Sequence, residues 1–440
     1  MSKRKYDASS IQVLEDDRDQ VRKRPTIFIP SKDAEGAMHL IYEIIDNAID
    51  ELSVKETVGD HIITTYDEST HMVTVTDNGA GIPQAKLLDV CTKLYSSGKF
   101  DNGEGTAYLV SGGLNGVGLT ATVYLSEIAE VSSMQKGKKL TYKFKDGFLK
   151  DTVEEKCKDH GTIVKFKIDN DIVRINDLVT KDLVDRYEEK SYRFPKIKMS
   201  LTILNKGKTK KKYEFYGKTI VDRIEMMKPD TEILYGKDTK KVSVLKHVND
   251  ENLTETKVGV EFAFAFKEEA VEDDDVYKYC IAYGNTIKNY KLGAHFNGLK
   301  DGIIKFFRED LQQTLNKRDR ELQFVPSDIC SGLCAFVIAE VTEPEFRGQY
   351  KDELLNPEAR RAVRDVVYDT LKDSKPSFQK KMGEFIVRVA RGRLESKKAR
   401  TKSKDVSNSF SKDRIKKYWP IIRTANTFEP ELILVEGTTI

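Results

Sequence analysis

The chain has 440 residues, of which 39% are hydrophobic and 33% are charged. This balance is typical of an ordinary globular protein and excludes an intrinsically disordered one, and the length favours two or three domains. No apolar stretch approaches the roughly 18 residues that cross a bilayer. A net charge of +3 is too small to indicate nucleic-acid binding, because the distribution of charge matters more than its sum.

The cysteines and the N-terminus favour a cytoplasmic setting. The five cysteines form no Cys-x-x-Cys pair and have no matching cluster of histidines. This pattern argues for reduced thiols and against a structural zinc site. Residues 1–7 are basic but lead into no apolar segment, which argues against a secretion signal. We therefore expect a cytoplasmic protein with no membrane partner.

The first half of the chain alternates between helix and strand patterns. Apolar residues from Leu40 to Leu52 recur at helical spacing, with acids and Asn47 on another side. Residues 71–76 alternate as in a strand and run into the turn signal Asp77-Asn78-Gly79. Further along, the pattern predicts an alternating strand and a hairpin with a lysine-rich turn, at residues 161–168 and 201–215 with the turn at 206–212.

A second unit is predicted to begin near Gly217. It contains an acidic loop at residues 268–275 and a polar stretch at 396–413 that we expect to be a linker or mobile loop. Two strands and two helices are also predicted in this half, at residues 279–283, 333–341, 357–371 and 378–398.

Basic residues crowd together between Arg388 and Lys404. Such a segment can bind backbone phosphates of DNA without reading sequence, which makes binding depend on salt. A solvated helix end explains the same run of charges, so both interpretations stay open.

The chain closes on a short apolar strand pattern at residues 432–435. A buried strand of this kind needs neighbouring strands, and the remaining sequence does not provide them. We therefore expect the chain to stop inside a further domain.

Three polar residues of the first predicted helix share one face. Glu43, Asn47 and Asp50 are spaced i, i+4 and i+7, which places them beside each other. A carboxylate near a side-chain amide suits water activation beside a divalent cation, because the acid accepts a proton and the amide oxygen binds the ion. A solvated polar face explains the same spacing.

Two glycine-containing segments follow. Asp77, at a strand end, can accept a hydrogen bond from a base amino group, and nearby glycines allow a close ligand approach. Residues 112–118 read Gly-Gly-Leu-Asn-Gly-Val-Gly and precede a helix pattern at 119–123, so their amides can face phosphate. The spacing matches neither a Walker nor a Rossmann pattern. Taken singly, a plain turn and a flexible loop explain these segments.

The ordered combination of motifs is more specific than any one of them. Glu-x-x-x-Asn on a helix, Asp-x-Gly-x-Gly after a strand, the Gly-rich run and then Gly161-Thr162 resemble the four motifs of the GHKL (Bergerat) ATPase superfamily. This resemblance implies ATP and Mg²⁺ as cofactors. It makes Glu43 the general base, Asn47 the magnesium ligand and Asp77 the adenine contact.

Within the superfamily, the chain is similar to gyrase B and topoisomerase IV B subunits and their phage and eukaryotic relatives. Residues 6–11 and 21–25 resemble their N-terminal arm and first helix, and residues 283–298 resemble a strand and loop of their second domain. Gln349-Tyr350-Lys351 stands where the family has Gln-Thr-Lys, so the resemblance makes Gln349 and Lys351 catalytic residues at the γ-phosphate.

The same resemblance implies a set of nucleotide-binding residues. In it, Tyr6 reaches the nucleotide of the partner subunit, Lys99 and the glycines through Gly118 form a lid over the phosphates, and Thr162 supports the adenine end. The complete set is Tyr6, Asn47, Asp50, Asp77, Gly81, Ile82, Pro83, Lys99, Tyr108, Ser111, Gly113, Leu114, Asn115, Gly116, Val117, Gly118 and Thr162.

The resemblance also implies an α+β fold in three parts. Residues 1–216 would form a GHKL α/β sandwich with a dimerisation arm, and residues 217–395 a transducer domain of ribosomal-protein-like βαβ type. Residues 396–440 would be a linker and the first strand of an incomplete TOPRIM domain, in which Glu436 matches the family's cleavage glutamate. The Asp-x-Asp element of that domain is absent, so we expect no DNA cleavage by this chain alone.

The implied function is the ATP-operated gate of a type IIA DNA topoisomerase. Its expected partners are double-stranded DNA, a second copy of the chain and a cleavage subunit or domain, in a bacterial cytoplasm or, if phage-encoded, the host's. Two alternatives remain, a MutL-like or chaperone-like ATPase clamp and a non-catalytic DNA-binding assembly subunit. The chain departs from the family at Ala80, where bacterial subunits have arginine, and at Thr26, Pro30 and Tyr350.

Overall fold

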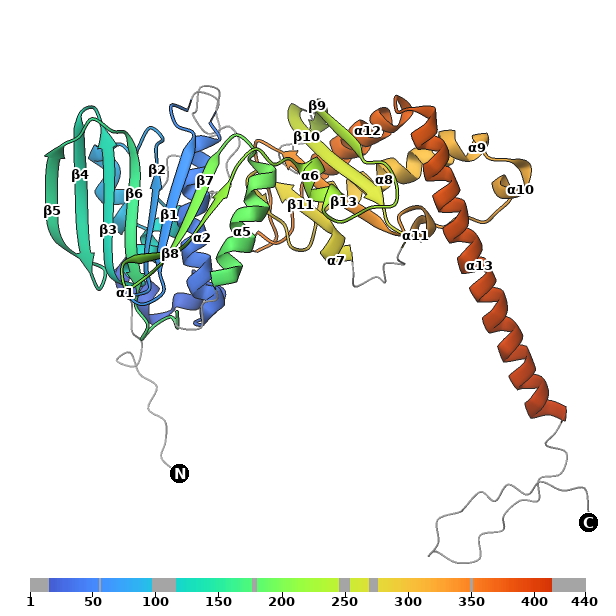
Figure 1. Cartoon of the computed structure of the whole chain (residues 1–440), viewed down its shortest axis with the longest axis horizontal. Coiled ribbons are helices and arrows are strands. Elements are labelled where there is room, and N and C mark those ends of the chain that lie inside the picture. Colours follow the sequence, from blue (N-terminus) through green and yellow to red (C-terminus); the bar gives the residue numbers. More distant parts are fainter. Residues whose placement is uncertain are drawn as a thin grey trace, which may run out of the picture.

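The computed structural model describes residues 16–54, 57–96, 116–175, 180–244, 254–268, 276–348 and 351–413. In this part of the chain, two α+β units lie side by side along the long axis of the molecule (Figure 1). Each unit has its own sheet and its own apolar core. None of the helices within the described ranges is both long and apolar enough to cross a membrane.

An eight-stranded sheet frames the first unit. Its strand order is β5-β4-β3-β6-β2-β1-β7-β8, and every neighbouring pair is antiparallel except β1 and β7. The strands are β1 (His61–Asp67), β2 (Met72–Asp77), β3 (Ser126–Gln135), β4 (Lys138–Lys145), β5 (Phe148–Lys156), β6 (Gly161–Ile168), β7 (Lys198–Asn205) and β8 (Lys208–Phe215).

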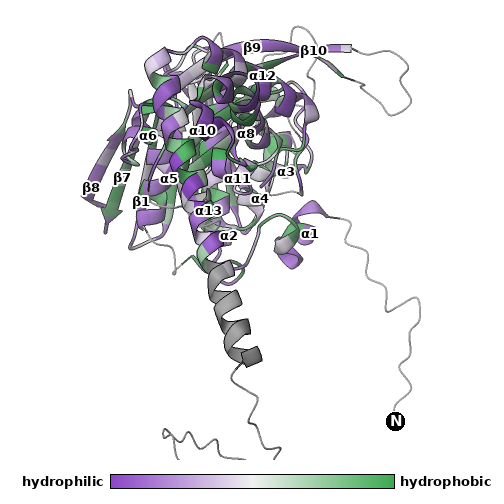
Figure 2. Cartoon of the chain, turned by 90° about the vertical axis from the view of Figure 1, so that its right-hand side faces the viewer, coloured by the Kyte–Doolittle hydropathy of each residue, from purple (hydrophilic) through white to green (hydrophobic). Residues whose placement is uncertain are grey.

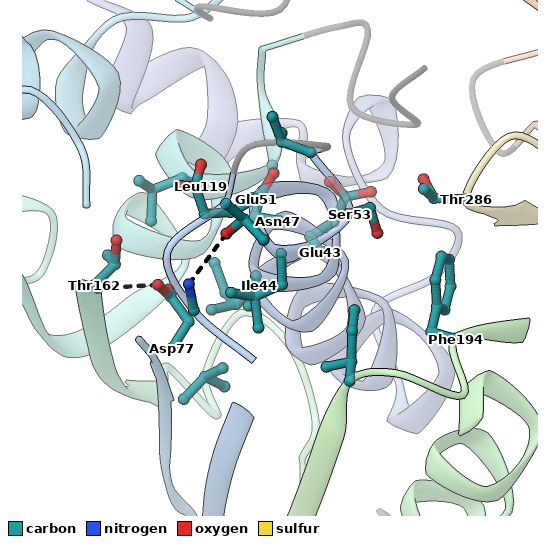
Figure 3. Close-up of a pocket in the computed structure, with 18 of the residues that line it drawn as sticks. Glu43, Ile44, Asn47, Glu51, Ser53, Asp77, Leu119, Thr162, Phe194 and Thr286 are labelled. Carbon is teal, nitrogen blue, oxygen red and sulfur yellow. Dashed lines mark hydrogen bonds between the residues drawn. The ribbon is translucent and has the colours of Figure 1, made fainter. Parts of the chain in front are cut away.

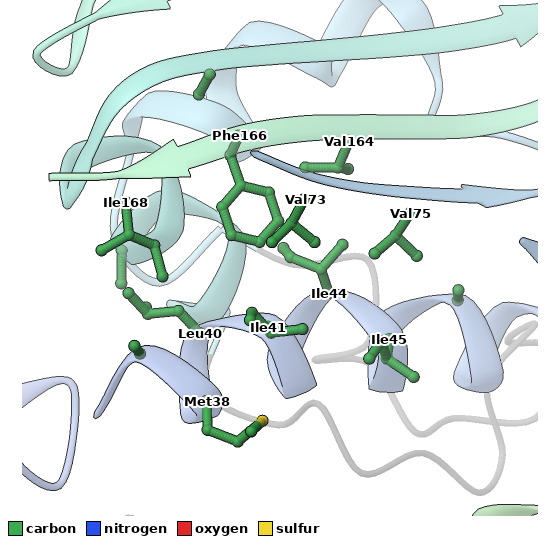
Figure 4. Packing of buried hydrophobic residues seen from close by; sticks show 14 of the residues in the cluster. Met38, Leu40, Ile41, Ile44, Ile45, Val73, Val75, Val164, Phe166 and Ile168 are labelled. Atoms are coloured by element: carbon green, nitrogen blue, oxygen red, sulfur yellow. The ribbon is translucent and has the colours of Figure 1, made fainter. Parts of the chain in front are cut away.

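Helices cover one face of this sheet. They are α1 (Asp17–Lys23), α2 (Ala34–Leu52), α3 (Leu87–Thr92), α4 (Gly118–Tyr124) and α5 (Thr180–Arg193), with 3-10 turns at Pro25–Ile27 and Gln84–Lys86. Helix α2 starts at its N-cap Asp33, whose carboxylate accepts from the Glu35 amide at 3.1 Å. Its apolar stripe, which includes Ile41 and Ile44, packs on β2 and β6 (Figure 4).

The burial pattern of β2 places its last residue under the helices. Val73, Val75 and Asp77 are buried, whereas the alternate residues are partly exposed. Because side chains alternate between the faces of a strand, Asp77 lies on the same face as the two valines. The sheet therefore presents a carboxylate to the covered side, next to α2.

A five-stranded sheet frames the second unit, in the order β12-β11-β13-β10-β9. Strands β11 and β13 are parallel, and helix α8 connects them, which makes a βαβ unit. The strands are β9 (Leu234–Val244), β10 (Thr254–Phe266), β11 (Cys280–Gly284), β12 (Ile287–Lys288) and β13 (Leu333–Glu340). The helices are α6 (Ile220–Glu225), α7 (Val276–Tyr279), α8 (Ala294–Phe306), α9 (Gln312–Thr314), α10 (Lys317–Arg320), α11 (Pro326–Ile329), α12 (Pro357–Lys372) and α13 (Pro376–Asp413), with a π-helical turn at Phe307–Leu311.

The last five residues of strand β10, 262–266, are buried on both faces, which explains their apolar sequence. Phe262, Phe264 and Phe266 belong to the core formed with α8, α12 and α13. Ala263 and Ala265 belong to a smaller core with α6 and with Tyr192 of α5. The last turn of α5, a helix of the first unit, therefore packs against the second unit.

Most of the expected elements are confirmed, with small shifts of their ends. The strand at residues 161–168 has the predicted bounds, and residues 201–215 do form a hairpin. Its turn is shorter than predicted, because Lys206 and Gly207 both have positive φ and close it in two residues. The remaining lysines of the run belong to strand β8.

The expectation of a mobile loop at residues 396–413 is wrong. Helix α13 continues through this stretch to Asp413 and runs away from the body of the second unit (Figure 1). The sequence contains neither glycine nor proline after Gly392 in this helix. Polarity alone predicted a loop, but without a breaker the helix propagates. Residues 414–440, including the predicted strand at 432–435 and Glu436, lie outside the described residues.

Three arginines of the basic segment anchor α13 to the second unit. Arg393 forms a two-pronged ion pair with the buried Asp328 of α11, at 2.6 and 3.0 Å. Arg391 pairs with Asp319 of α10, and Arg388 pairs with Glu268 at 2.6 Å. Their charges are therefore already neutralised by this chain, whereas Lys397 and Lys398 are exposed. In Figure 2, which faces the right-hand side of Figure 1, α13 runs downward in front of other helices.

We expect Arg393→Ala to destabilise the protein by about 2 kcal/mol, because it leaves the Asp328 carboxylate buried without its counter-charge. Thermal or urea unfolding measures this effect. Arg388→Ala is the matched control: the Arg388–Glu268 pair is exposed at 60% and 52%, so its loss should cost about 0.5 kcal/mol or less. Equal effects of the two substitutions would contradict the anchoring role of Arg393.

Candidate functional site

A cavity of about 2120 Å³ opens beside α2 and continues between the two units. Its volume exceeds the roughly 300–1,000 Å³ of a typical ligand site, because it joins a pocket in the first unit to the groove against the second. Glu43 and Asn47 project from α2 toward this space (Figure 3). Asp77 and Thr162 lie together on one side of the cavity, and Thr286 lies on the other side.

Glu43 stands against the start of α4. A Cβ atom built on Gly118 would lie 2.1 Å from its carboxylate oxygen, so only glycine permits this approach. On the other side, the imidazole Nε2 of His39 is 3.6 Å from the Glu43 carboxylate, one turn earlier on the same helix. The carboxylate is thus held between two elements at the edge of the cavity, where it can accept a proton from a bound water.

Asp77 lies at the deep end of the pocket and is 6% exposed. Its Oδ1 accepts from the Gly79 amide at 2.9 Å and from the Thr162 amide at 3.2 Å. Burial raises the pKa of Asp77 to about 6, against the effect of these two hydrogen bonds. Gly161 makes the contact possible: its φ is +120°, and a Cβ there would lie 2.0 Å from the Asp77 carbonyl oxygen.

The loop after β2 is held from both sides. The Glu51 carboxylate accepts from the Ala80 amide at 2.9 Å, and the Gln135 amide donates to the carbonyls of Ala80 and Gly81 at 2.8 and 2.7 Å. The hydroxyl of Ser133 donates to the Ile82 carbonyl at 2.5 Å. The backbone of this loop therefore forms one wall of the cavity with little freedom to move.

Lys351 reaches the same cavity from the second unit. Its backbone is in the left-handed region, with φ of +57°, and its carbonyl accepts from the side-chain amide of Asn289 at 2.7 Å. The cavity is therefore lined by an acid from the first unit and a lysine from the second, although the two residues are more than 300 positions apart in the sequence.

Eleven of the predicted site residues line this cavity: Glu43, Asn47, Asp77, Gly81, Ile82, Pro83, Gly116, Val117, Gly118, Thr162 and Lys351. Eight lie outside the described residues: Tyr6, Lys99, Tyr108, Ser111, Gly113, Leu114, Asn115 and Gln349.

Asp50 differs from the other predicted residues, because it is buried and is not part of the cavity lining. Its Oδ1 accepts from the Thr286 hydroxyl of the second unit at 2.7 Å. Sequence spacing placed it correctly beside Glu43 and Asn47, yet its carboxylate turns toward the neighbouring unit.

Sequence reasoning missed two kinds of residue. His39 precedes Glu43 by four positions, a spacing that would have suggested the contact. Thr286 and Asn289 carry no comparable signal, because their partners Asp50 and Lys351 are distant in sequence.

Comparisons with known proteins agree with this geometry. Residues 32–172 match the family model described as histidine kinase-, DNA gyrase B-, and HSP90-like ATPase, and residues 216–405 match the model described as DNA gyrase B. The chain belongs to the B-subunit family of type IIA topoisomerases. The GHKL fold with a following transducer is thereby confirmed, as is the α+β class.

Individual relatives cover most of this chain. It is 31% identical over 384 residues to the DNA gyrase B protein of Mycoplasma genitalium, a match that covers 82% of this chain and 56% of that protein. It is 29% identical over 453 residues to the DNA topoisomerase 4 B protein of Staphylococcus epidermidis, a match that covers 98% and 64%. The chain thus spans less than two thirds of the length of these topoisomerase proteins.

A solved structure shows the same arrangement of elements. The 43K ATPase domain of Thermus thermophilus gyrase B, in complex with an aminocoumarin, superimposes with a TM-score of 0.61 at 25% identity. The match covers 87% of this chain and 97% of that domain. Both units of the chain therefore take part in the similarity.

The residues beside Glu43 fit a magnesium ion held mainly by a ligand's phosphates. Among the described residues, no group of three or more histidine, cysteine, aspartate or glutamate side chains could hold a metal. Asn47 supplies a single amide at the cavity. Mg²⁺ is commonly bound by one or two protein groups together with substrate phosphates and waters, which is the donor set that this site offers.

Without a ligand, we expect Asp77→Asn to stabilise the protein at neutral pH. The pKa of Asp77 in the folded chain, about 6, exceeds that of an unfolded aspartate, so its charge costs stability as pH rises from about 4 to about 6. The gain should be nearly absent near pH 4 and reach about 3 kcal/mol above pH 6, measured by thermal unfolding across pH.

Asp60→Asn provides the control with the opposite sign. The Lys198 ammonium, which donates to the exposed Asp60 carboxylate, lowers the pKa of that group. Removing this charge should not stabilise the protein at any pH above its pKa. Parallel responses of the two variants to pH would contradict the assignment.

Proposed function

We propose that this chain binds and hydrolyses ATP and serves as the ATP-operated gate of a type IIA topoisomerase. One observation carries the proposal: Glu43 from the first unit and Lys351 from the second line a single cavity that also holds the buried Asp77. ATP hydrolysis uses a proton acceptor, for which Glu43 is suited, and a positive charge at the terminal phosphate, for which Lys351 is suited. Asp77 can recognise the base.

The deep end of the cavity suits adenine. The Asp77 carboxylate can accept from the amino group of the base, because Gly79 and Thr162 donate to its Oδ1 and leave it oriented. Leaving such a buried acceptor without a partner is unfavourable, so the site favours a base that carries an amino group over one that lacks it.

The outer end suits the triphosphate. Glu43 accepts a proton from the attacking water, and His39 and Gly118 fix the direction of its carboxylate. The Lys351 ammonium stabilises the negative charge that develops on the terminal phosphate. Asn47 would hold Mg²⁺, which neutralises phosphate charge when it is bound.

The gate follows from the position of Lys351 on the second unit. A lysine that contacts only the terminal phosphate makes the angle between the units depend on whether that phosphate is present. We assign dimerisation to the N-terminal arm with Tyr6, and capture of double-stranded DNA to the closed dimer, with cleavage by a partner subunit or further domains. The clamp and assembly-subunit alternatives do not explain the match of residues 216–405 to the gyrase B model.

We expect Glu43→Gln to lower the rate of ATP hydrolysis by at least about a hundredfold, because the amide cannot act as a general base. Phosphate release measures the rate, and calorimetry should show that ATP still binds. Glu35→Gln, an exposed acid on the same helix, is the control and should keep wild-type activity. Hydrolysis by Glu43→Gln at the wild-type rate would remove the catalytic claim.

We expect a non-hydrolysable ATP analogue to convert the monomeric chain to a dimer in sedimentation velocity experiments, because bound nucleotide stabilises the dimer. Glu43→Gln should dimerise with ATP itself and stay dimeric, since it binds without hydrolysing. Asp77→Asn, which loses the adenine contact, should remain monomeric. A sedimentation coefficient that is the same with and without the analogue would argue against the gate.

A further inference from the structure

The loop between β11 and α8 links the two units at the cavity. We call residues 285–293 the connector; it includes the short strand β12. One end of the connector is bonded to the first unit, and the other end is bonded to the segment that carries Lys351.

The first end of the connector is fixed beneath the catalytic helix. The Thr286 hydroxyl donates to Asp50 of α2 at 2.7 Å, and the Thr286 carbonyl accepts from the Lys190 ammonium of α5 at 2.9 Å. Lys190 is 1% exposed and also pairs with Asp46 of α2 at 2.8 Å. Each of these groups is buried or partly buried, so a broken contact would leave a desolvated polar atom.

Helix α2 therefore presents two sets of polar groups. By the 3.6-residue repeat, Glu43 and Asn47 stand within an arc of about 100° that also contains Asp46 and Asp50. The first pair faces the cavity, whereas the second pair contacts Lys190 and Thr286. Because the connector is bonded to α2 through Asp50, and through Lys190 to Asp46, a movement of α2 is expected to move the connector with it.

The second end of the connector is paired with the lysine segment. The Asn289 side-chain amide donates to the Lys351 carbonyl at 2.7 Å. The Lys291 amide donates to the Asp352 carbonyl at 2.9 Å, and the Ala294 amide at the start of α8 donates to the Leu354 carbonyl at 2.7 Å. Asn289 is 1% exposed, and its backbone amide donates to the Ala282 carbonyl of β11 at 2.8 Å.

We propose that Asn289 is a positioning residue for Lys351, and that the connector transmits the position of the catalytic helix to the lysine. This inference rests on the proposed function, because it assumes that Lys351 acts on the terminal phosphate. Lysine has a long, flexible side chain, so its ammonium can be placed reproducibly only if its backbone is fixed. The buried Asn289 amide fixes that backbone in the left-handed conformation that Lys351 adopts.

The test compares Asn289→Ala and Asn289→Leu with the wild-type chain. Leucine keeps the branched shape of the side chain, leaves no cavity and removes the donor, so it decides the question if the alanine variant does not fold. We expect kcat for ATP hydrolysis to fall roughly tenfold to a hundredfold while KM changes little. Affinity for ADP, which lacks the terminal phosphate, should be unchanged, whereas the preference for a non-hydrolysable ATP analogue over ADP should be lost.

Lys291→Ala is the matched control. It removes the Lys291–Asp352 pair, which joins the same two segments at the surface at 3.6 Å, and it should keep wild-type kinetics. Lys351→Ala should reproduce the loss of preference for the analogue, because both changes act through one ammonium group.

Two results would overturn the positioning role. One is wild-type kinetics in both Asn289 variants. The other is an equal loss of affinity for ADP and for the analogue together with a lower melting temperature, which is the behaviour of a merely structural residue. If the wild-type chain itself neither binds nor hydrolyses ATP, the proposed function fails first, and that result is distinct from an effect confined to the variants.

Discussion

Helix α2 contacts the sheet, the cavity and the polar groups between the two units at the same time. The rest of the structure depends on this constraint. Its apolar stripe packs on β2 and β6, and Glu43 and Asn47 face the cavity. Asp50 contacts Thr286 of the second unit, and Asp46 pairs with Lys190 of α5. A helix offers separate faces to each neighbour only because its side chains radiate at a fixed angle. Glu43 and Asn47 are therefore placed by the same packing that stabilises the first unit.

The second theme is the use of buried charge. Asp77 is held in a desolvated position that raises its pKa to about 6, and backbone amides from the loop after β2 and from β6 orient it. Such a group destabilises the empty protein and is well suited to bind a donor, so stability is exchanged for recognition. Lys190 is buried in the same way between the units, but it has Asp46 as a counter-charge.

The contact between the units is polar where it approaches the site and apolar further away. Tyr192 of α5 packs with Ile220 and Phe336 in a shared small core, whereas the connector meets α2 and α5 through hydrogen bonds and an ion pair. A buried polar contact is directional and leaves a desolvated atom when it is broken, whereas apolar packing is not directional. The polar contacts therefore fix the connector relative to α2 and α5 more specifically than the small core does.

The sequence by itself determined the pieces of the site: the spacing of Glu43 and Asn47, the strand that ends at Asp77, and the glycines at positions 118 and 161, since these patterns are local and follow from helix and strand periodicity. It misjudged residues 396–413, because polarity indicates exposure without distinguishing a loop from a solvated helix. The family resemblance, not a local pattern, implied that Lys351 acts beside Glu43, and both line one cavity in the structure. Only the tertiary structure decided that Asp50 turns to Thr286 and that Arg393 is neutralised by Asp328. These contacts join residues that are distant in the chain, and their energies depend on burial, which no local pattern specifies.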